Sequence, residues 1–217
     1  MTTKLFWDDP YKTECMAKVT SIVGNKVKLD QTVFYAFSGG QLSDEGTIGE
    51  IKVIEAKKEG DKEDIIDIEY TLESEPEFLV GDTVQVKIDG ERREKLRRLH
   101  SAAHVVYYIT IAVLGNVKIN GSEIQTEKAR MDFGYEDSIV EKIPIIEQKA
   151  NMFISGNHNI IMQPDTEKPE LKWWTCETWK MPCGGTHVKN TSEIGPLKLK
   201  RINKGKGRER IEMYLTL

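Results

Sequence analysis

The sequence predicts an α+β protein, in which a small N-terminal β-barrel precedes an α+β unit with one long helix and a mainly antiparallel sheet. Short β-rich runs separated by turn residues fill residues 1–88. At Asp89-Gly90 the spacing of apolar residues changes from the period of a strand to that of a helix. We therefore expect a β-barrel domain over residues 1–88 and an α+β domain over residues 89–217.

The composition is that of a globular protein. Of the 217 residues, 39% are hydrophobic and 30% are charged, with a net charge of −4, which excludes an intrinsically disordered chain. No apolar run approaches the ~20 residues that a membrane-spanning helix needs, and the first residues lack the apolar core of a signal peptide. The three cysteines are far apart and form no disulfide framework, so we expect a cytoplasmic protein.

The N-terminal half contains five or six short strands. Two β-rich runs flank Gly24-Asn25, which is a hairpin signal, and a second pair over residues 48–58 and 64–72 is joined near Gly60-Asp61. Residues 81–89 add another alternating strand. This pattern is typical of a small barrel or sandwich.

The long helix has a start and a stop signal. Asp89 is an expected N-cap and Gly115 an expected end, and the apolar residues between them recur at helical spacing over ~24 residues. Beyond it the sequence predicts two strands ending at Phe133, a helix over 138–155 that Pro144 either begins or kinks, a strand over 157–163, an irregular stretch over 166–182, and two closing strands.

Two short motifs predict a metal site. His100 and His104 lie one turn apart on the long helix, so their imidazoles project from one face. Cys183 and His187 bracket a Gly-Gly turn, and three of the four histidines fall in these two motifs. Three nitrogens and one sulfur suit tetrahedral zinc. The glutamate base of the H-E-x-x-H zinc proteases is absent, which disfavours protease chemistry.

Several blocks resemble a known family. HSAAH, ARMDF and PCGGTHVKNTSEIGPLKLKR, which cover most of residues 91–217, are similar to the editing domain of alanyl-tRNA synthetase and its freestanding AlaX relatives. TVFYAFSGGQLSDEGTI resembles the glycine-rich block of the two-domain AlaX type, although Ala36 and Ser38 replace the proline and glycine usual in the family. The chain lacks the ATP-binding synthetase core, so it resembles the standalone trans-editing enzyme.

The resemblance implies hydrolysis of the ester that links a wrong amino acid to alanine tRNA. Serine is the expected substrate and glycine the second, because a pocket built for alanine excludes neither well. It also implies one zinc ion, held by His100, His104, Cys183 and His187, in the editing pocket. Asn120 or Ser122 is expected to contact the serine hydroxyl, with an Asn-Gly turn as the alternative, and Gln41 to have a supporting role.

Basic residues close to both motifs are expected to contact tRNA phosphates, which gives affinity with little sequence information. On charge alone, solvated helix and hairpin faces explain them equally well. The expected contacts are Arg97, Arg98, Lys198, Lys200, Arg201, Lys204 and Lys206.

Two other functions are compatible with the motifs: a zinc hydrolase of a small-molecule ester or amide, and an RNA-binding module with a structural zinc. Zinc with four protein ligands is normally structural, whereas a catalytic site keeps one position open. Editing therefore requires that one ligand is loose or that the metal takes a fifth ligand.

Overall fold

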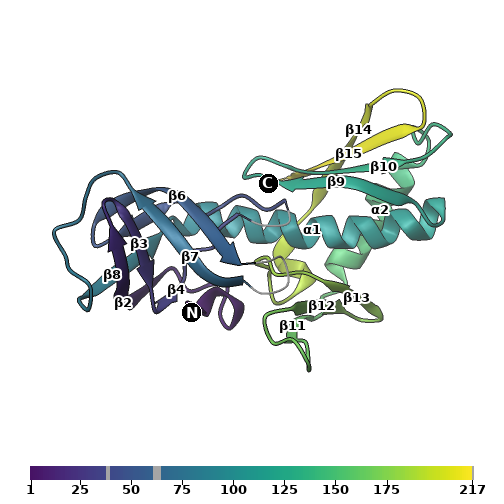
Figure 1. Cartoon of the computed structure of the whole chain (residues 1–217). Helices are drawn as coiled ribbons and strands as arrows, with labels where there is room; N and C mark the ends of the chain where they lie inside the picture. The colour runs from purple at the N-terminus through teal and green to yellow at the C-terminus, as the bar shows by residue number, and fades with distance from the viewer. Residues whose placement is uncertain (38–39, 61–64, 217) are drawn as a thin grey trace.

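The structure, a computed structural model, describes residues 1–37, 40–60 and 65–216. It confirms the α+β class, because two α-helices accompany strands in these ranges that pair almost entirely antiparallel. The long helix α1 (Gly90–Leu114) extends from the N-terminal strands into the C-terminal part of the chain (Figure 1). Neither helix in the described ranges has the length and apolar character to cross a membrane.

The N-terminal strands pair in a closed ring, in the order β2-β3-β7-β6-β5-β8 with β8 returning to β2. The predicted hairpin around Gly24-Asn25 is present, since β2 and β3 pair antiparallel. β1 (Thr3–Lys4) and β4 (Gln31–Thr32) form a separate parallel pair. The ring consists of β2 (Glu14–Val23), β3 (Lys26–Leu29), β5 (Gly46–Ile48), β6 (Ile51–Gly60), β7 (Ile65–Leu72) and β8 (Thr83–Ile88).

Alternating side chains fill the inside of this ring. In β8, Val84, Val86 and Ile88 are buried while the residues between them are exposed, as the sequence pattern predicts. They join one hydrophobic cluster that runs from Phe6 to Ile88, and a second cluster begins at Leu96 in the helix. The division into domains at residue 88 remains a prediction.

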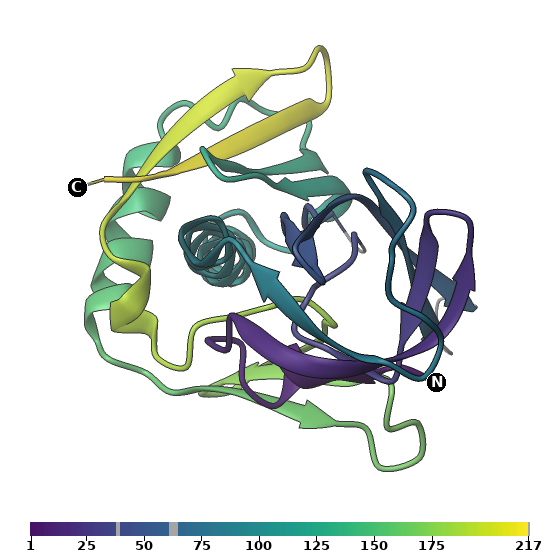
Figure 2. The same ribbon diagram turned by 90° about the vertical axis from the view of Figure 1, so that its left-hand side faces the viewer.

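Helix α1 begins and ends at the expected signals. The Asp89 side chain accepts a hydrogen bond from the Arg92 backbone N–H at 3.0 Å, and Gly115 ends the helix with a φ of 85° that a residue with a side chain rarely adopts. Viewed along its axis, α1 is surrounded by the other elements (Figure 2). Polar residues such as Ser101 and Thr110 are therefore buried together with its apolar ones.

The C-terminal strands form two sheets. The first has the order β14-β15-β10-β9 and the second β11-β12-β13, all antiparallel. The expectation of an irregular stretch over 166–182 was wrong, because β12 and β13 form a hairpin there with Trp174 fully buried. The bounds are β9 (Lys118–Ile124), β10 (Ala129–Gly134), β11 (Ile160–Pro164), β12 (Lys172–Cys176), β13 (Trp179–Pro182), β14 (Leu197–Asn203) and β15 (Arg208–Leu215).

The remaining helices are short. α2 (Ile143–Ser155) begins one residue before Pro144, so the proline starts a helix and does not kink one. Two 3₁₀ helices, η1 (Leu5–Trp7) and η2 (Thr191–Ile194), precede β2 and β14. The Asn190 side chain caps η2.

A buried ion pair attaches the start of α1 to the N-terminal strands. The Arg93 side chain is 1% exposed, and its Nε donates to Asp44 Oδ1 at 3.0 Å. Its other nitrogens donate to the backbone carbonyls of Val33 at 2.6 Å and Pro10 at 3.2 Å. Asp44 also accepts from the Tyr35 backbone N–H, so both charges have several partners.

Replacing Arg93 with methionine would leave the Asp44 carboxylate buried without its cation. We expect the free energy of unfolding, measured by urea denaturation, to fall by about 3–5 kcal/mol. The matched control is Lys57→Met, because Lys57 and its partner Glu55 form a surface ion pair with side chains 63% and 50% exposed. That change should cost less than about 1 kcal/mol, and equal stabilities of the two variants would contradict the prediction.

Candidate metal centre

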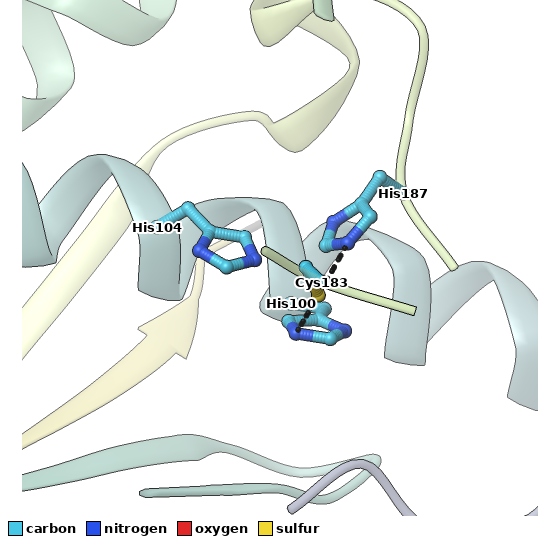
Figure 3. Close-up of side chains that lie close together, drawn as sticks. All are labelled: His100, His104, Cys183 and His187. Atoms are coloured by element: carbon cyan, nitrogen blue, oxygen red, sulfur yellow. Dashed lines mark hydrogen bonds between the residues drawn. The ribbon is translucent and has the colours of Figure 1, made fainter. Parts of the chain in front are cut away.

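The structure brings the four predicted ligands together from two distant parts of the chain (Figure 3). His100 and His104 come from α1, and Cys183 and His187 from the loop that follows β13. One ligand atom from each residue lies within 4.8 Å of all the others. Cys183 Sγ lies 3.5 Å from His100 Nε2 and 3.2 Å from His187 Nε2. A tetrahedral zinc ion would hold sulfur and nitrogen roughly 3.5 Å apart, so these residues could hold a metal ion.

The glycines of the loop let it approach the helix. A Cβ atom on Gly185 would lie 2.2 Å from His100 Cε1, so any side chain at this position would collide with a ligand. Two hydrogen bonds also hold the loop in place, one at Cys183 and one at Gly184. The Cys183 backbone N–H donates to the Lys172 carbonyl at 2.8 Å, and Trp7 Nε1 donates to the Gly184 carbonyl at 3.0 Å.

Burial keeps the three imidazoles in the neutral form that binds a metal ion, but it also favours the protonated thiol of Cys183. It lowers the pKa of His100 to about 3 and holds the pKa values of His104 and His187 well below the ordinary value, so all three imidazoles are neutral. His104 Nε2 is buried and has no hydrogen-bond partner among the described residues. Burial also raises the pKa of the Cys183 thiol to about 11. An unsatisfied ring nitrogen beside a thiol and two further imidazoles fits a metal ion.

Gln41 orients His100. Its side chain is fully buried, and Oε1 accepts from His100 Nδ1 at 2.7 Å and from the Thr186 backbone N–H at 3.0 Å. Because this oxygen only accepts, the proton of His100 is on Nδ1, and the lone pair of Nε2 faces Cys183. Gln41 Nε2 donates to Thr186 Oγ1 at 3.0 Å. Gly39 of the glycine-rich block lies outside the described residues.

A cavity of about 210 Å³ lies beside the centre. Two of the ligands, His100 and His104, are part of its wall, so the centre is open on this side. Ser122 lines the cavity, whereas Asn120 does not. Asn120 is the extra residue of a β-bulge in β9, and the predicted Asn-Gly turn is absent. The remaining lining residues are Ala103, Tyr107, Ile119, Ile124, Met131 and Met181.

Two of the predicted RNA contacts interact with the protein itself. Arg97 is 7% exposed, lies 3.9 Å over the Tyr11 ring and donates to the Pro10 carbonyl at 3.0 Å, which removes it from the surface. Arg98 donates to the Ile194 carbonyl at 3.0 Å. Both follow from the burial of α1, which the sequence pattern alone does not reveal.

The other five predicted contacts lie on the hairpin of β14 and β15. Lys198 pairs with Glu147 at 2.9 Å, and Arg201 forms two hydrogen bonds with Glu209. Lys200 lies over the Tyr214 ring, and Lys204 and Lys206 are exposed.

Comparisons with known proteins agree with this geometry. A family model described as the threonyl and alanyl tRNA synthetase second additional domain matches residues 162–212. The alanyl-tRNA editing protein AlaX-M of Pyrococcus horikoshii is 37% identical over 99% of this chain and 98% of its own length. Alanine–tRNA ligases of Sulfurisphaera tokodaii and Methanococcus aeolicus are 34% and 31% identical, over 94% and 97% of this chain but 25% of each ligase.

Metal affinity should rise with pH. The Cys183 thiol, with a pKa near 11, must lose its proton to bind a metal, whereas the neutral imidazoles release none. We expect the association constant to increase about tenfold per pH unit near neutral pH, as measured by competition with a chromogenic chelator. Cys183→Ala should bind more weakly and lose most of this dependence. A pH-independent affinity of the unaltered protein would contradict the prediction.

Gln41→Leu should weaken metal binding about 10–100-fold, because His100 loses the acceptor that orients it. Gln41→Glu keeps an acceptor oxygen for both His100 and the Thr186 backbone N–H, so it should bind metal close to normally. The control is Gln85→Leu, since Gln85 is exposed on β8 and its side chain donates to Glu14 at 3.3 Å, away from the centre. Equal metal affinities of the Gln41→Leu and Gln85→Leu proteins would refute the orienting role.

Proposed function

The chain belongs to the family of alanyl-tRNA editing proteins, and from this premise we propose that it is a trans-editing hydrolase of mischarged alanine tRNA. Its reaction is hydrolysis of the ester between the terminal ribose and a wrong amino acid. The observation that supports this most directly is the four-residue centre that opens onto the 210 Å³ cavity. A closed structural metal site in an RNA-binding module would lack such an opening.

We assign zinc to the centre because three imidazoles and one thiolate are its typical ligand set. When bound, zinc supplies a Lewis acid that polarises an ester carbonyl or lowers the pKa of water. The protein holds the site in one geometry. Gln41 orients His100, and Trp174 stacks on the His104 ring at 4.8 Å between centroids.

The cavity is suited to a small amino acid. Its wall is mostly apolar, and Ser122 is its polar residue on β9. We propose that Ser122 contacts the serine hydroxyl and that Asn120 has no part in this. A site that hydrogen-bonds a substrate hydroxyl discriminates strongly against the analogue without it, so serine is the preferred substrate and glycine the second.

We propose that the closed strand ring is a small β-barrel domain over residues 1–88 and that residues 89–217 form the editing domain. The exposed lysines of the β14–β15 hairpin, Lys200, Lys204 and Lys206, are the proposed surface contacts to tRNA phosphates. Lys198 and Arg201 can add charge there despite their ion pairs.

Deacylation of alanine tRNA charged with serine, glycine or alanine tests the function. We expect release of serine, slower release of glycine and no release of alanine, with activity lost on chelation. His104→Ala removes a ligand and should lower the rate of serine release at least about a hundredfold. His158→Ala is the control, because His158 pairs with Glu177 at 2.9 Å and is not part of the centre. A His104→Ala protein as active as this control would refute the metal role.

A small-molecule hydrolase would give a different result. It would cleave a free seryl ester as fast as seryl-tRNA, whereas the proposed enzyme needs the tRNA for binding.

A further inference from the structure

Lys58 is a cation that no described carboxylate neutralises. It lies on β6, is half-buried, and its Nζ stands 4.7 Å from the centroid of the Tyr35 ring. It lines a second cavity of about 580 Å³ between β6, residues 42–45 and the start of α1. The other basic residues of this cavity are paired, Lys57 with Glu55 and Arg92 with Glu45.

A second lysine without an ion pair, Lys172, lies beside the loop of residues 183–187, called the metal loop below. Lys172 Nζ is 4.6 Å from the centroid of the Trp7 ring, and no carboxylate in the described ranges forms an ion pair with it. The Lys172 carbonyl accepts from the Cys183 N–H, and Trp7 Nε1 donates to the Gly184 carbonyl. Lys4, whose Nζ is also near Trp7, differs because it pairs with Glu170 at 2.7 Å.

The two free ammonium groups are held at an electrostatic cost. Burial, and then the charge of Lys4, lowers the pKa of Lys58 to about 8, while Cys183 acts in the opposite direction. Burial also lowers the pKa of Lys172. The nearby charges of Glu170 and Asp8 offset this effect only in part for Lys172, so the net direction for both lysines is a lowered pKa. Partly desolvated cations oppose folding, and an anionic ligand would relieve this cost.

The proposed function supplies such an anion next to the metal centre. The ester sits on the terminal ribose of the tRNA, so the last phosphodiesters of the unpaired 3′ end lie within a few nucleotides of the metal centre when the aminoacyl group reaches the cavity. Proteins bind single-stranded nucleic acid with cationic groups that follow the phosphate backbone, and Lys58 and Lys172 supply two such groups. The rings of Tyr35 and Trp7 hold the two ammonium groups in place.

Resting on the proposed function, we propose that Lys58 and Lys172 form a phosphodiester-binding site for the unpaired 3′ end of the tRNA acceptor arm. This site is distinct from the surface lysines of the β14–β15 hairpin. It lies where the N-terminal strands meet the metal loop, so both parts of the chain contribute to it.

Binding of an RNA minihelix tests the site. The probe is an alanine acceptor stem ending in CCA with serine in a non-hydrolysable amide linkage, and its dissociation constant is measured by fluorescence anisotropy at several salt concentrations. Lys58→Met and Lys172→Met keep the aliphatic stems but remove the charges. Each should weaken binding roughly tenfold to a hundredfold and lower the salt dependence by about 0.7 of a counterion.

Two further variants isolate the charge. Lys57→Met, the neighbour on the same strand with its own partner Glu55, should bind the minihelix like the unaltered protein. Lys58→Arg keeps the charge and should restore most of the affinity. Metal affinity, measured by chelator competition, should be unchanged in Lys172→Met, Lys57→Met and Lys58→Arg. It should fall slightly in Lys58→Met, because the Lys58 charge partly offsets the rise in the pKa of the Cys183 thiol that burial causes, so minihelix binding of this variant is compared at saturating metal. Unchanged dissociation constants and salt slopes in both Lys58→Met and Lys172→Met would overturn the proposal.

The results of the binding and deacylation experiments distinguish a failure of the phosphodiester site from a failure of the proposed hydrolase function. If the unaltered protein binds the minihelix through Lys58 and Lys172 but releases no serine, the hydrolase assignment fails and the phosphodiester site stands. If it releases serine and both methionine variants bind normally, the phosphodiester site fails and the hydrolase assignment stands.

Discussion

The burial of most of α1 is the constraint on which the rest of the structure depends; a few of its residues, such as Glu91 and Lys95, stay exposed. A helix surrounded by other elements must find a partner for every polar side chain it carries, since unpaired buried polar groups cost several kcal/mol each, on the order of the stability of a domain. Arg93 finds Asp44, His100 finds Gln41, and Ser101 accepts from the Val188 N–H at 3.1 Å. Three atoms of α1 are buried without a partner in the described structure, namely Arg97 Nε, His104 Nε2 and Thr110 Oγ1. Of these, His104 Nε2 lies beside the other three candidate ligands, so a metal ion would give it a partner.

These partners come from both ends of the chain, which explains why the N-terminal strands are part of the site. Gln41 follows β4, and its neighbour Gly40 accepts from the Ile124 N–H of β9 at 2.8 Å. A side chain on Gly40 would lie 2.6 Å from the Ser122 carbonyl, so the glycine permits this close approach. The same segment therefore orients a ligand and borders the strand that lines the cavity. Similarity to the alanine–tRNA ligases also extends over 94% of the chain or more, and so includes both parts.

Different elements of the fold hold the ligands, line the cavity and anchor the loop. The helix and the loop after β13 hold the ligands, β9 and β10 form the apolar cavity, and Trp7 anchors the loop from the N-terminal side. Lysines near Trp7 and Tyr35 lie outside the ligand set but close to its loop. A reaction on the end of a long polyanion is served by this separation, because the cavity holds the small apolar end of the substrate while the phosphates keep counter-charges outside it.

The sequence alone determined those features that depend on residues close together along the chain. One helical turn between His100 and His104, the Cys183–His187 spacing, the Asp89 cap and the Gly115 stop are short-range features, so the helix and the four ligands could be predicted. Only the tertiary structure decided that Gln41 bonds His100, that Arg97 is buried against Tyr11, that Asn120 bulges out and leaves Ser122 in the cavity, and that residues 172–182 form a hairpin. Each of these depends on segments far apart in sequence, whose meeting is set by packing and burial and not by a local period.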